Sequence, residues 1–509
     1  MTFKRAYFFL QIFVVAVISV LFLGERGLAQ TDESSKALES IRRKVEMRTL
    51  PNGLRVIMYK RGWAPVFSGV VTVRVGGVDE KEGQTGISHM FEHMAFKGTQ
   101  QIGTSNFEAE KILLAELEKV MSQQNKDGSL SEDLLKERAR IEQELSKIWT
   151  GDEFVRLYRV NGAEDMNATT SKELTTYMSS FPKSGFEFWC QTESERLLTP
   201  VLRQFYQERD VVMEERRMRY DDSPDGKMYE LLLGTSYMMH PYRTPVIGYE
   251  HDIRNLTAAA TEEFRKQFYV PNNIVVSVVG DIDVERDFPL IEKYFGRLPA
   301  GVEPPRPQVV EPSQQGQRGV VLKAFAAPQA YLAYRKPNFP HPDDPPLGVM
   351  AELLVGSRSS PVYKYLVEEK KVVSSIDHDE APGSAYPNLL IFAGVPKAPA
   401  GNEAFIKAFD EKLEEFKKNL VDVELLEIAK RDMAMDYLMH LQSSLDLAKS
   451  FASAELLHGG WAAVITWYES AMAVSPQDIQ RVAREYLKKD NRTISKIEPI
   501  EEKGGVSGQ

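Results

Sequence analysis

Cysteine is almost missing from this sequence: its 509 residues include only Cys190. One thiol cannot form an intrachain disulfide, and its isolation excludes the cysteine-rich zinc and iron–sulfur sites. Histidine is also scarce, with eight residues in the chain. Any metal bound by this protein must therefore be held by a few histidines together with carboxylates.

An excess of positive charge is missing too. The 63 Lys and Arg residues are outnumbered by 73 Asp and Glu residues, which gives a formal charge of −10 and a pI near 5.6. This balance disfavours nucleic acid as a partner. Hydrophobic, aromatic and charged contents of 43%, 10% and 27% are those of a folded soluble protein. A chain of this length predicts two to four domains, at roughly 100 to 200 residues each.

One long apolar run occurs, at the N-terminus. Lys4 and Arg5 precede the run from Ala6 to Gly24, and small residues at Gly27 and Ala29 suit a cleavage site. We predict that residues 1–29 are a secretory signal peptide, and that the body is exported to the periplasm or otherwise out of the cytoplasm. At about 19 residues the run could nearly span a bilayer, so an uncleaved N-terminal membrane anchor is the alternative.

The body begins with alternating strand and helix patterns. Residues 48–58 place a Pro-Asn-Gly turn before an apolar run, and residues 70–75 form a second run of this kind. Residues 86–98 have a helical pattern that begins and ends near glycines. These patterns indicate an α+β chain.

Residues 105–150 have a different pattern. Ser105 and Glu108 resemble a capping box, and apolar residues then recur at helical spacing on both sides of a turn at Asp127. We predict an antiparallel helical hairpin inserted into the first domain. A packing role is the favoured interpretation, and a partner-docking arm is the alternative.

Residues 300–318 are rich in Pro, Gly and Gln and have no periodicity, which predicts a linker. We therefore predict an N-terminal domain at 40–299, a C-terminal domain at 319–497 and a tail at 498–509. Without the hairpin the two domains are similar in size, which suggests a duplication.

The residues that indicate chemistry are 89–93, His-Met-Phe-Glu-His. On a helix, His89 and His93 lie one turn apart on one face, with Glu92 beside them. Two imidazoles and one carboxylate make a three-ligand zinc site with an open position for water, and a further carboxylate can take the proton of that water. Glu92 fits this general-base role. A helix that packs two histidines in a core is the alternative.

The third ligand is expected to be a carboxylate on another helix. Glu208 and Glu215 are seven residues apart, so at about 100° per residue they share one helix face, whereas Glu214 points away. Glu215 is the candidate ligand, and Glu208 is a candidate outer partner for it or for a histidine. From the residues alone, a solvated helix face explains both glutamates as well.

Several blocks of this sequence match, in order, the motifs of one peptidase family. The blocks are residues 50–54, 75–80, 86–99, 167–177, 208–215, 240–242 and 269–281. With the inverted motif at 89–93, the chain resembles the pitrilysin/insulysin zinc peptidases, and within them the bacterial exported two-domain members and the mitochondrial processing peptidase beta subunit. The resemblance covers residues 45 to 497.

This resemblance implies a fold and a site. The expected fold is a pair of homologous α+β domains, each an antiparallel sheet backed by helices, which close like a clam on extended peptides. The implied zinc ligands are His89, His93 and Glu215, with Glu92 as the base. Asn167 and Ala168 are expected on an edge strand that binds the substrate as a further strand. A plain strand edge is the alternative for these two residues.

One departure from the family bears on assembly. The family's C-terminal domain carries an arginine and, seven residues later, a tyrosine that grip the substrate, and these positions hold Val367 and Ser374. We therefore expect a related chain to supply these residues in a heterodimer, with a homo-oligomer as the alternative. The separation of His93 and Glu215 is also longer than is usual in the family, and the hairpin supplies the extra length.

The sequence thus predicts an exported zinc endopeptidase that hydrolyses unfolded or short peptides with a water activated by Glu92. The alternative is a non-catalytic structural or binding subunit, like the respiratory-complex core proteins that resemble this family. Such subunits typically lose motif residues, whereas His89, Glu92, His93 and Glu215 are all present here.

Overall fold

The structure is a computed structural model that describes residues 36–62, 64–125 and 127–500, and the chain divides into two units, Met1–Lys44 and Val45–Gln509. In the first unit, residues 36–44 are helical. The predicted signal peptide at 1–29 lies outside the described residues. Among the described residues, no helix is both long enough and apolar enough to cross a membrane.

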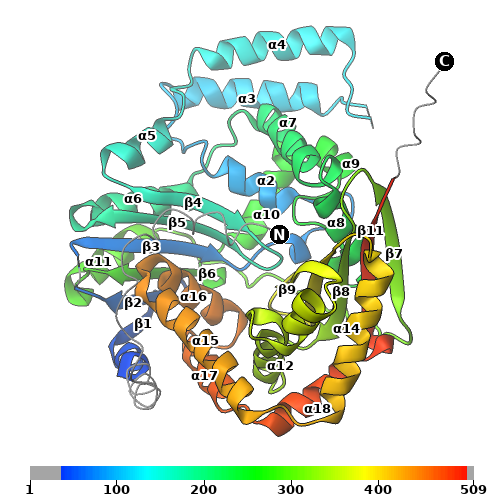
Figure 1. Cartoon of the computed structure of the whole chain (residues 1–509). Coiled ribbons are helices and arrows are strands. Elements are labelled where there is room, and N and C mark those ends of the chain that lie inside the picture. Colours follow the sequence, from blue (N-terminus) through cyan, green and yellow to red (C-terminus); the bar gives the residue numbers. More distant parts are fainter. Residues whose placement is uncertain (1–35, 63, 126, 501–509) are drawn as a thin grey trace, which may run out of the picture. The chain divides into compact units, whose positions relative to one another are not determined.

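Six strands form the first sheet of the second unit, in the order β1-β2-β6-β3-β5-β4 (Figure 1). They are β1 (Val45–Thr49), β2 (Arg55–Lys60), β3 (Val66–Val73), β4 (Glu164–Thr170), β5 (Thr175–Pro182) and β6 (Ile274–Gly280). Strands β2 and β6 are parallel, and the other neighbours are antiparallel. All seven residues of β6 are buried, as expected for a valine-rich central strand covered on both faces.

Five strands form the second sheet, in the order β7-β11-β8-β10-β9. They are β7 (Arg318–Ala324), β8 (Gln329–Lys336), β9 (Val373–Ala381), β10 (Asn388–Pro396) and β11 (Arg492–Pro499). The parallel pair β7 and β11 takes the place of β2 and β6, and β9 is an edge strand as β4 is. The two halves therefore repeat one strand plan, and the predicted α+β class with two similar sheets is confirmed.

Helices connect these strands in both halves. Those of the first half are α2 (Ile87–Met94), α3 (Phe107–Met121), α4 (Glu132–Ser146), α5 (Glu153–Val160), α6 (Phe186–Leu198), α7 (Phe205–Arg216), α8 (Pro224–Ser236), α9 (Glu250–Asn255), α10 (Ala258–Phe268) and α11 (Val284–Phe295). Those of the second half are α12 (Asp344–Ala351), α13 (Pro361–Tyr363), α14 (Gly401–Lys418), α15 (Val423–Gln442), α16 (Ser444–Leu457), α17 (Ala463–Met472) and α18 (Pro476–Tyr486).

Helices α3 and α4 lie side by side, at the top of the view in Figure 1. The predicted start of α3 needs a correction, because Asn106 is its N-cap and accepts the backbone N–H of Ala109 at 3.2 Å. The Ser105 hydroxyl instead donates to the carbonyl oxygen of Ile148, beyond the end of α4. The serine therefore ties together the two ends of the helix pair.

Each half of the second unit contributes one helix that packs on the sheet of the other half. Helix α16 packs on β3 and β6 of the first sheet, where Glu455 pairs with Arg55 at 2.9 Å. Helix α8 packs on β7 and β11 of the second sheet, and its Met228 and Leu232 lie in a core with Ile497. Each sheet thus has part of its apolar cover supplied by the other half.

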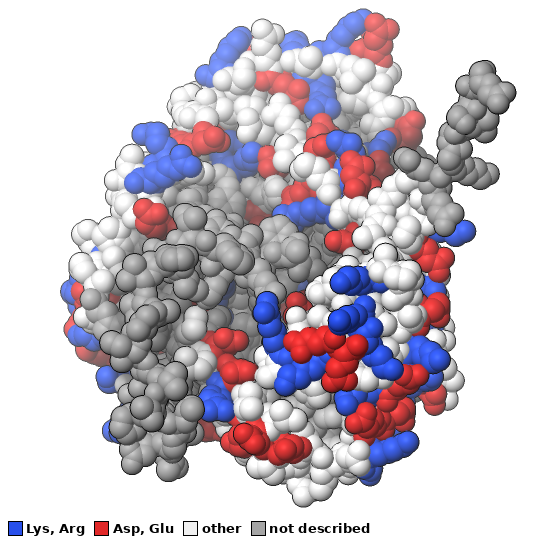
Figure 2. All heavy atoms as spheres, in the orientation of Figure 1, with Lys and Arg blue, Asp and Glu red and all other residues white. Residues whose placement is uncertain are grey.

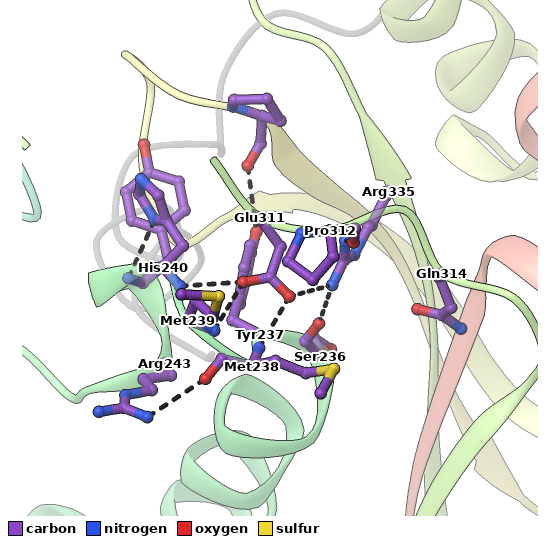
Figure 3. A network of polar contacts seen from close by, with 12 residues as sticks. Ser236, Tyr237, Met238, Met239, His240, Arg243, Glu311, Pro312, Gln314 and Arg335 are labelled. Atoms are coloured by element: carbon purple, nitrogen blue, oxygen red, sulfur yellow. Dashed lines mark hydrogen bonds and ion pairs between the residues drawn. The ribbon is translucent and has the colours of Figure 1, made fainter. Parts of the chain in front are cut away.

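One carboxylate of the chain between the halves contacts both of them. Glu311 accepts the backbone N–H groups of Met238, Met239 and His240 at 2.8 to 2.9 Å, and it pairs with Arg335 of β8 at 2.9 Å (Figure 3). Burial alone would raise its pKa, but these donors together lower the pKa to about 2. The predicted linker is therefore held to both halves at this point.

Candidate metal centre

Helix α2 carries residues 89–93 and has a fixed beginning. Its N-cap Gly86 has a φ of +89°, and an added Cβ would lie 2.4 Å from the carbonyl oxygen of Ile247. The Glu80 carboxylate accepts the backbone N–H groups of Gly86 and Ser88 at 2.9 and 3.0 Å, which satisfies two N–H groups at the helix start. The position of the two histidines is therefore set by a glycine that no other residue replaces without strain.

Three side chains converge at this helix. The Nε2 atoms of His89 and His93 lie 3.7 and 3.5 Å from Oε2 of Glu215 on α7, and the three potential ligand atoms all lie within 4.8 Å of one another. Ligands at about 2.0–2.2 Å from a tetrahedral zinc ion are themselves about 3.4 Å apart. Both histidine–glutamate separations are close to this value, and the three residues predicted to bind zinc have donor atoms that suit zinc.

The electrostatics of this cluster favour a cation. Burial would lower the pKa of His93, but Glu208 and Glu215 together raise it to about 9. Burial and the neighbouring His93 lower the pKa of His89 to about 4, so its imidazole is neutral and has a free lone pair. A zinc ion between these groups would take the place of the proton that the two carboxylates stabilise on His93.

Glu208 lies where the seven-residue spacing places it, about two turns before Glu215 on the same face of α7. Its Oε1 is 2.9 Å from Nδ1 of His93, and its Oε2 is 2.6 Å from Nζ of Lys97. This contact fixes the ring so that Nε2 points toward Glu215. Burial would raise the pKa of Glu208, but the contacts with His93 and Lys97 lower it to about 2.

Two polar side chains that the sequence analysis missed also contact this site. Arg219, in the π-helical turn Arg217–Asp221 that follows α7, lies 2.8 Å from Oε1 of Glu215. Thr170 at the end of β4 donates its hydroxyl to Oε2 of Glu92 at 2.5 Å. The i, i+4 spacing of Glu215 and Arg219 could have indicated the first contact. Thr170 lies in a motif block, but no local pattern links it to Glu92.

Glu92 itself is largely buried next to the two histidines. Burial raises its pKa, and the hydrogen bond from Thr170 acts in the opposite direction. A carboxylate in such an environment has a higher proton affinity than one in water. This environment makes Glu92 a stronger base than an exposed glutamate.

Asn167 and Ala168 lie on β4, which is the last strand of the first sheet in the described part of the chain. Asn167 is exposed and Ala168 is buried, and the pairing of β4 with β5 is irregular between Glu164 and Asn167. The outer edge of β4 has backbone N–H and C=O groups that a further strand can pair with.

Val367 and Ser374 are held in the second half. Val367 packs against the core of this half, and the Ser374 hydroxyl donates to the carbonyl oxygen of Val395 at 3.1 Å. Between them, Lys371 has a φ of +56°, a conformation that favours glycine. Neither side chain offers a guanidinium or a phenol to a substrate.

Comparisons with known proteins relate this chain to peptidases. Residues 56–112 match the family described as insulinase, peptidase family M16, and residues 255–433 match the peptidase M16 inactive domain. Zinc protease PqqE of Helicobacter pylori is 29% identical over 464 residues, which cover 90% of this chain and 93% of that protein. The probable mitochondrial-processing peptidase subunit beta of Schizosaccharomyces pombe is 25% identical over 262 residues, 51% of this chain and 47% of that protein.

Solved structures share the fold. The crystal structure of a protease from Helicobacter pylori has a TM-score of 0.76 and 27% identity, over 90% of this chain and 100% of that one. The periplasmic protease PqqL of Escherichia coli has a TM-score of 0.69 and 16% identity, over 89% of this chain and 47% of that one.

Fold and sequence matches together define this chain as a zinc metallopeptidase, so the non-catalytic alternative is not favoured. Both of its family matches are to the insulinase family, which is peptidase family M16, and its sequence relatives include zinc proteases.

Proposed function

We propose that His89, His93 and Glu215 hold the zinc ion and that Glu92 is the proton acceptor for peptide-bond hydrolysis. The observation that supports this most directly is the convergence of three ligand atoms within 4.8 Å, next to a partly buried carboxylate that is not needed as a ligand. The histidine ring at 93 is oriented by Glu208, and Arg219 holds the second oxygen of Glu215.

Zinc, when bound, supplies a Lewis acid that activates water and polarises the substrate carbonyl. Glu92 accepts one proton from the attacking water and passes it to the amine that leaves when the peptide C–N bond breaks. His93 would give up its proton to bind the ion, so two neutral imidazoles and one carboxylate would leave a bound zinc ion with net positive charge, which would favour the oxygen that becomes negative during attack.

The proposed substrates are unfolded or short peptides. An extended peptide can pair with the outer edge of β4 at Asn167 and Ala168, beside Glu92. A folded protein has no free strand to offer, so its cleavage should be slow. Hydrolysis of a tightly folded domain at the rate of its unfolded form would contradict this substrate class.

Export and assembly are the remaining parts of the proposal. The signal-like residues 1–29 support export, and one structural relative is described as periplasmic. Val367 and Ser374 support pairing with a related chain that carries the arginine and tyrosine, or with a second copy. This chain matches only 47% of the PqqL chain, which therefore has length for a second unit of this size.

The test is hydrolysis of an unstructured peptide by the wild type and by Glu92→Gln. Glutamine has nearly the same shape but accepts no proton at neutral pH, so the rate should fall about 10²-fold or more while zinc is retained. Glu214→Gln removes an exposed carboxylate of α7 and is the matched control, with unchanged activity expected. Wild-type turnover by Glu92→Gln would remove Glu92 from the mechanism.

A further inference from the structure

One face of strand β4 contacts helix α2, which carries His89, Glu92 and His93. Side chains alternate between the two faces of a strand, so Ala168 and Thr170 share the face that packs against α2, and Thr169 points the other way. In agreement, Ala168 is buried and Thr169 is exposed. The strand with the proposed peptide-binding edge thus turns one of its hydroxyls toward Glu92.

The contact between Thr170 and Glu92 is short. The Oγ1 atom of Thr170 lies 2.5 Å from Oε2 of Glu92, within the range of O–H···O⁻ hydrogen bonds to a charged acceptor. In the described part of the chain, Glu92 accepts no other hydrogen bond. Threonine is β-branched and therefore stiff at χ1, so the backbone of β4 sets the direction of the hydroxyl.

A carboxylate that accepts a proton needs a defined orientation. Rotation about the last side-chain bond of Glu92 is broad, and proton transfer requires the accepting oxygen within hydrogen-bond reach of the water. A hydrogen bond to Oε2 fixes the carboxylate plane and leaves Oε1 available. The same hydrogen bond links the base to the strand that aligns the peptide.

We propose that Thr170 is a positioning residue that orients Glu92 relative to the bound peptide. This inference rests on the proposed function, in which Glu92 is the proton acceptor. Thr170 does not contact the zinc ligands and is not needed to bind the ion. Its loss should therefore lower the rate of the chemical step and leave zinc binding unchanged.

The test compares Thr170→Val, Thr170→Ser and Thr169→Val in the full-length chain. Valine keeps the shape and removes the donor, serine keeps the donor, and Thr169→Val makes the same change on the other face of β4. We expect Thr170→Val to lower kcat about 10- to 100-fold, with KM and zinc content unchanged, since small errors of alignment cost up to about 10²-fold. Thr170→Ser should keep most of the rate, and Thr169→Val should resemble the wild type.

A double variant identifies the residue through which Thr170 acts. If Thr170 serves Glu92, then Thr170→Val combined with Glu92→Gln should be no slower than Glu92→Gln alone, within about twofold. Additive losses would overturn the inference. Loss of zinc or of cooperative unfolding in Thr170→Val would also overturn it, because the role would then be structural. An active Glu92→Gln variant would instead contradict the proposed function.

Discussion

The carboxylate of Glu215 is shared between two kinds of partner. One oxygen faces the two imidazoles, and the other lies 2.8 Å from the guanidinium of Arg219. The carboxylate is 16% exposed, whereas the arginine side chain is 63% exposed at the edge of the site. Arg219 would thus leave one oxygen of Glu215 for the proposed zinc ion.

Arg219→Gln should weaken zinc binding, because outer partners of metal ligands typically contribute 10- to 100-fold to affinity. We expect the lower end, about 10-fold, since the pair is partly exposed to solvent. Competition with a chelator at fixed pH measures this change. Arg217→Gln is the control, because Arg217 pairs with Glu214 and Asp222 instead. Equal zinc affinity in the two variants would mean that Arg219 has no such role.

Spacing in the sequence was sufficient to predict some of the site residues and insufficient to predict others. His89, Glu92 and His93 lie within one helical turn and a half, and the shared face of Glu208 and Glu215 follows from a separation of seven residues. Thr170 is 78 residues from Glu92, and the pair meets only because β4 packs against α2. Such a contact depends on the pairing of the sheet, which a single sequence does not encode in any local pattern.

At the scale of elements, the helix pair α3 and α4 packs against the parts that carry the site. Arg203, just before α7, binds the carbonyl oxygens of Lys97, Thr99 and Ile102 in the loop that follows α2. Glu110 of α3 neutralises this arginine with contacts of 2.6 and 2.9 Å, and both side chains are buried. These contacts support the packing role expected for the hairpin.

Glu110→Gln should lower the free energy of unfolding by about 3 to 5 kcal/mol, because it leaves the charge of Arg203 buried and unpaired. The exposed Glu116→Gln on the same helix should change it by about 0.5 kcal/mol or less. Chemical denaturation followed by tryptophan fluorescence compares the two. Equal stability of both variants would show that Arg203 does not need its partner.

The contacts of Glu311, in the segment between the sheets, should make the stability of the protein depend on pH. Its pKa in the folded chain is about 2, below the ordinary value of 4.5, so its stabilising effect is complete above about pH 4.5 and is lost as the pH falls toward 2. Glu311→Gln does not titrate. The stability difference between wild type and this variant should therefore be constant from pH 7 to 5 and shrink at lower pH. A difference that stays constant down to pH 3 would contradict the assigned contacts.

At the scale of the molecule, the sequence predicts two similar α+β halves but not the exchange of helices between them. This prediction rests on the similar size of the parts on both sides of residues 300–318 and on the resemblance to the pitrilysin/insulysin peptidases. The apolar residues of α8, such as Met228 and Leu232, predict that the helix is packed in a core. They do not predict that this core belongs to the sheet of the other half. The charged surface agrees with the composition, because acidic and basic side chains are mixed over the face seen in Figure 2.

Partner dependence is a prediction for the whole molecule. Without the arginine and tyrosine, a substrate lacks donors that are each typically worth about 10²- to 10³-fold in rate. The chain alone should therefore be weakly active, and a related chain that carries both residues should raise the activity strongly. The combined Val367→Arg and Ser374→Tyr substitutions test whether a second copy can take this part. Full activity of a preparation that light scattering shows to be monomeric would contradict the pairing.

The most direct test of the proposed site is the zinc content of three purified proteins, measured by elemental analysis. We predict about one zinc per chain in the wild type and in Glu92→Gln, and almost none in His93→Ala. This pattern separates a ligand at position 93 from a proton acceptor at position 92. Full zinc content in His93→Ala, or a fully active wild type that carries no metal, would contradict the site described here.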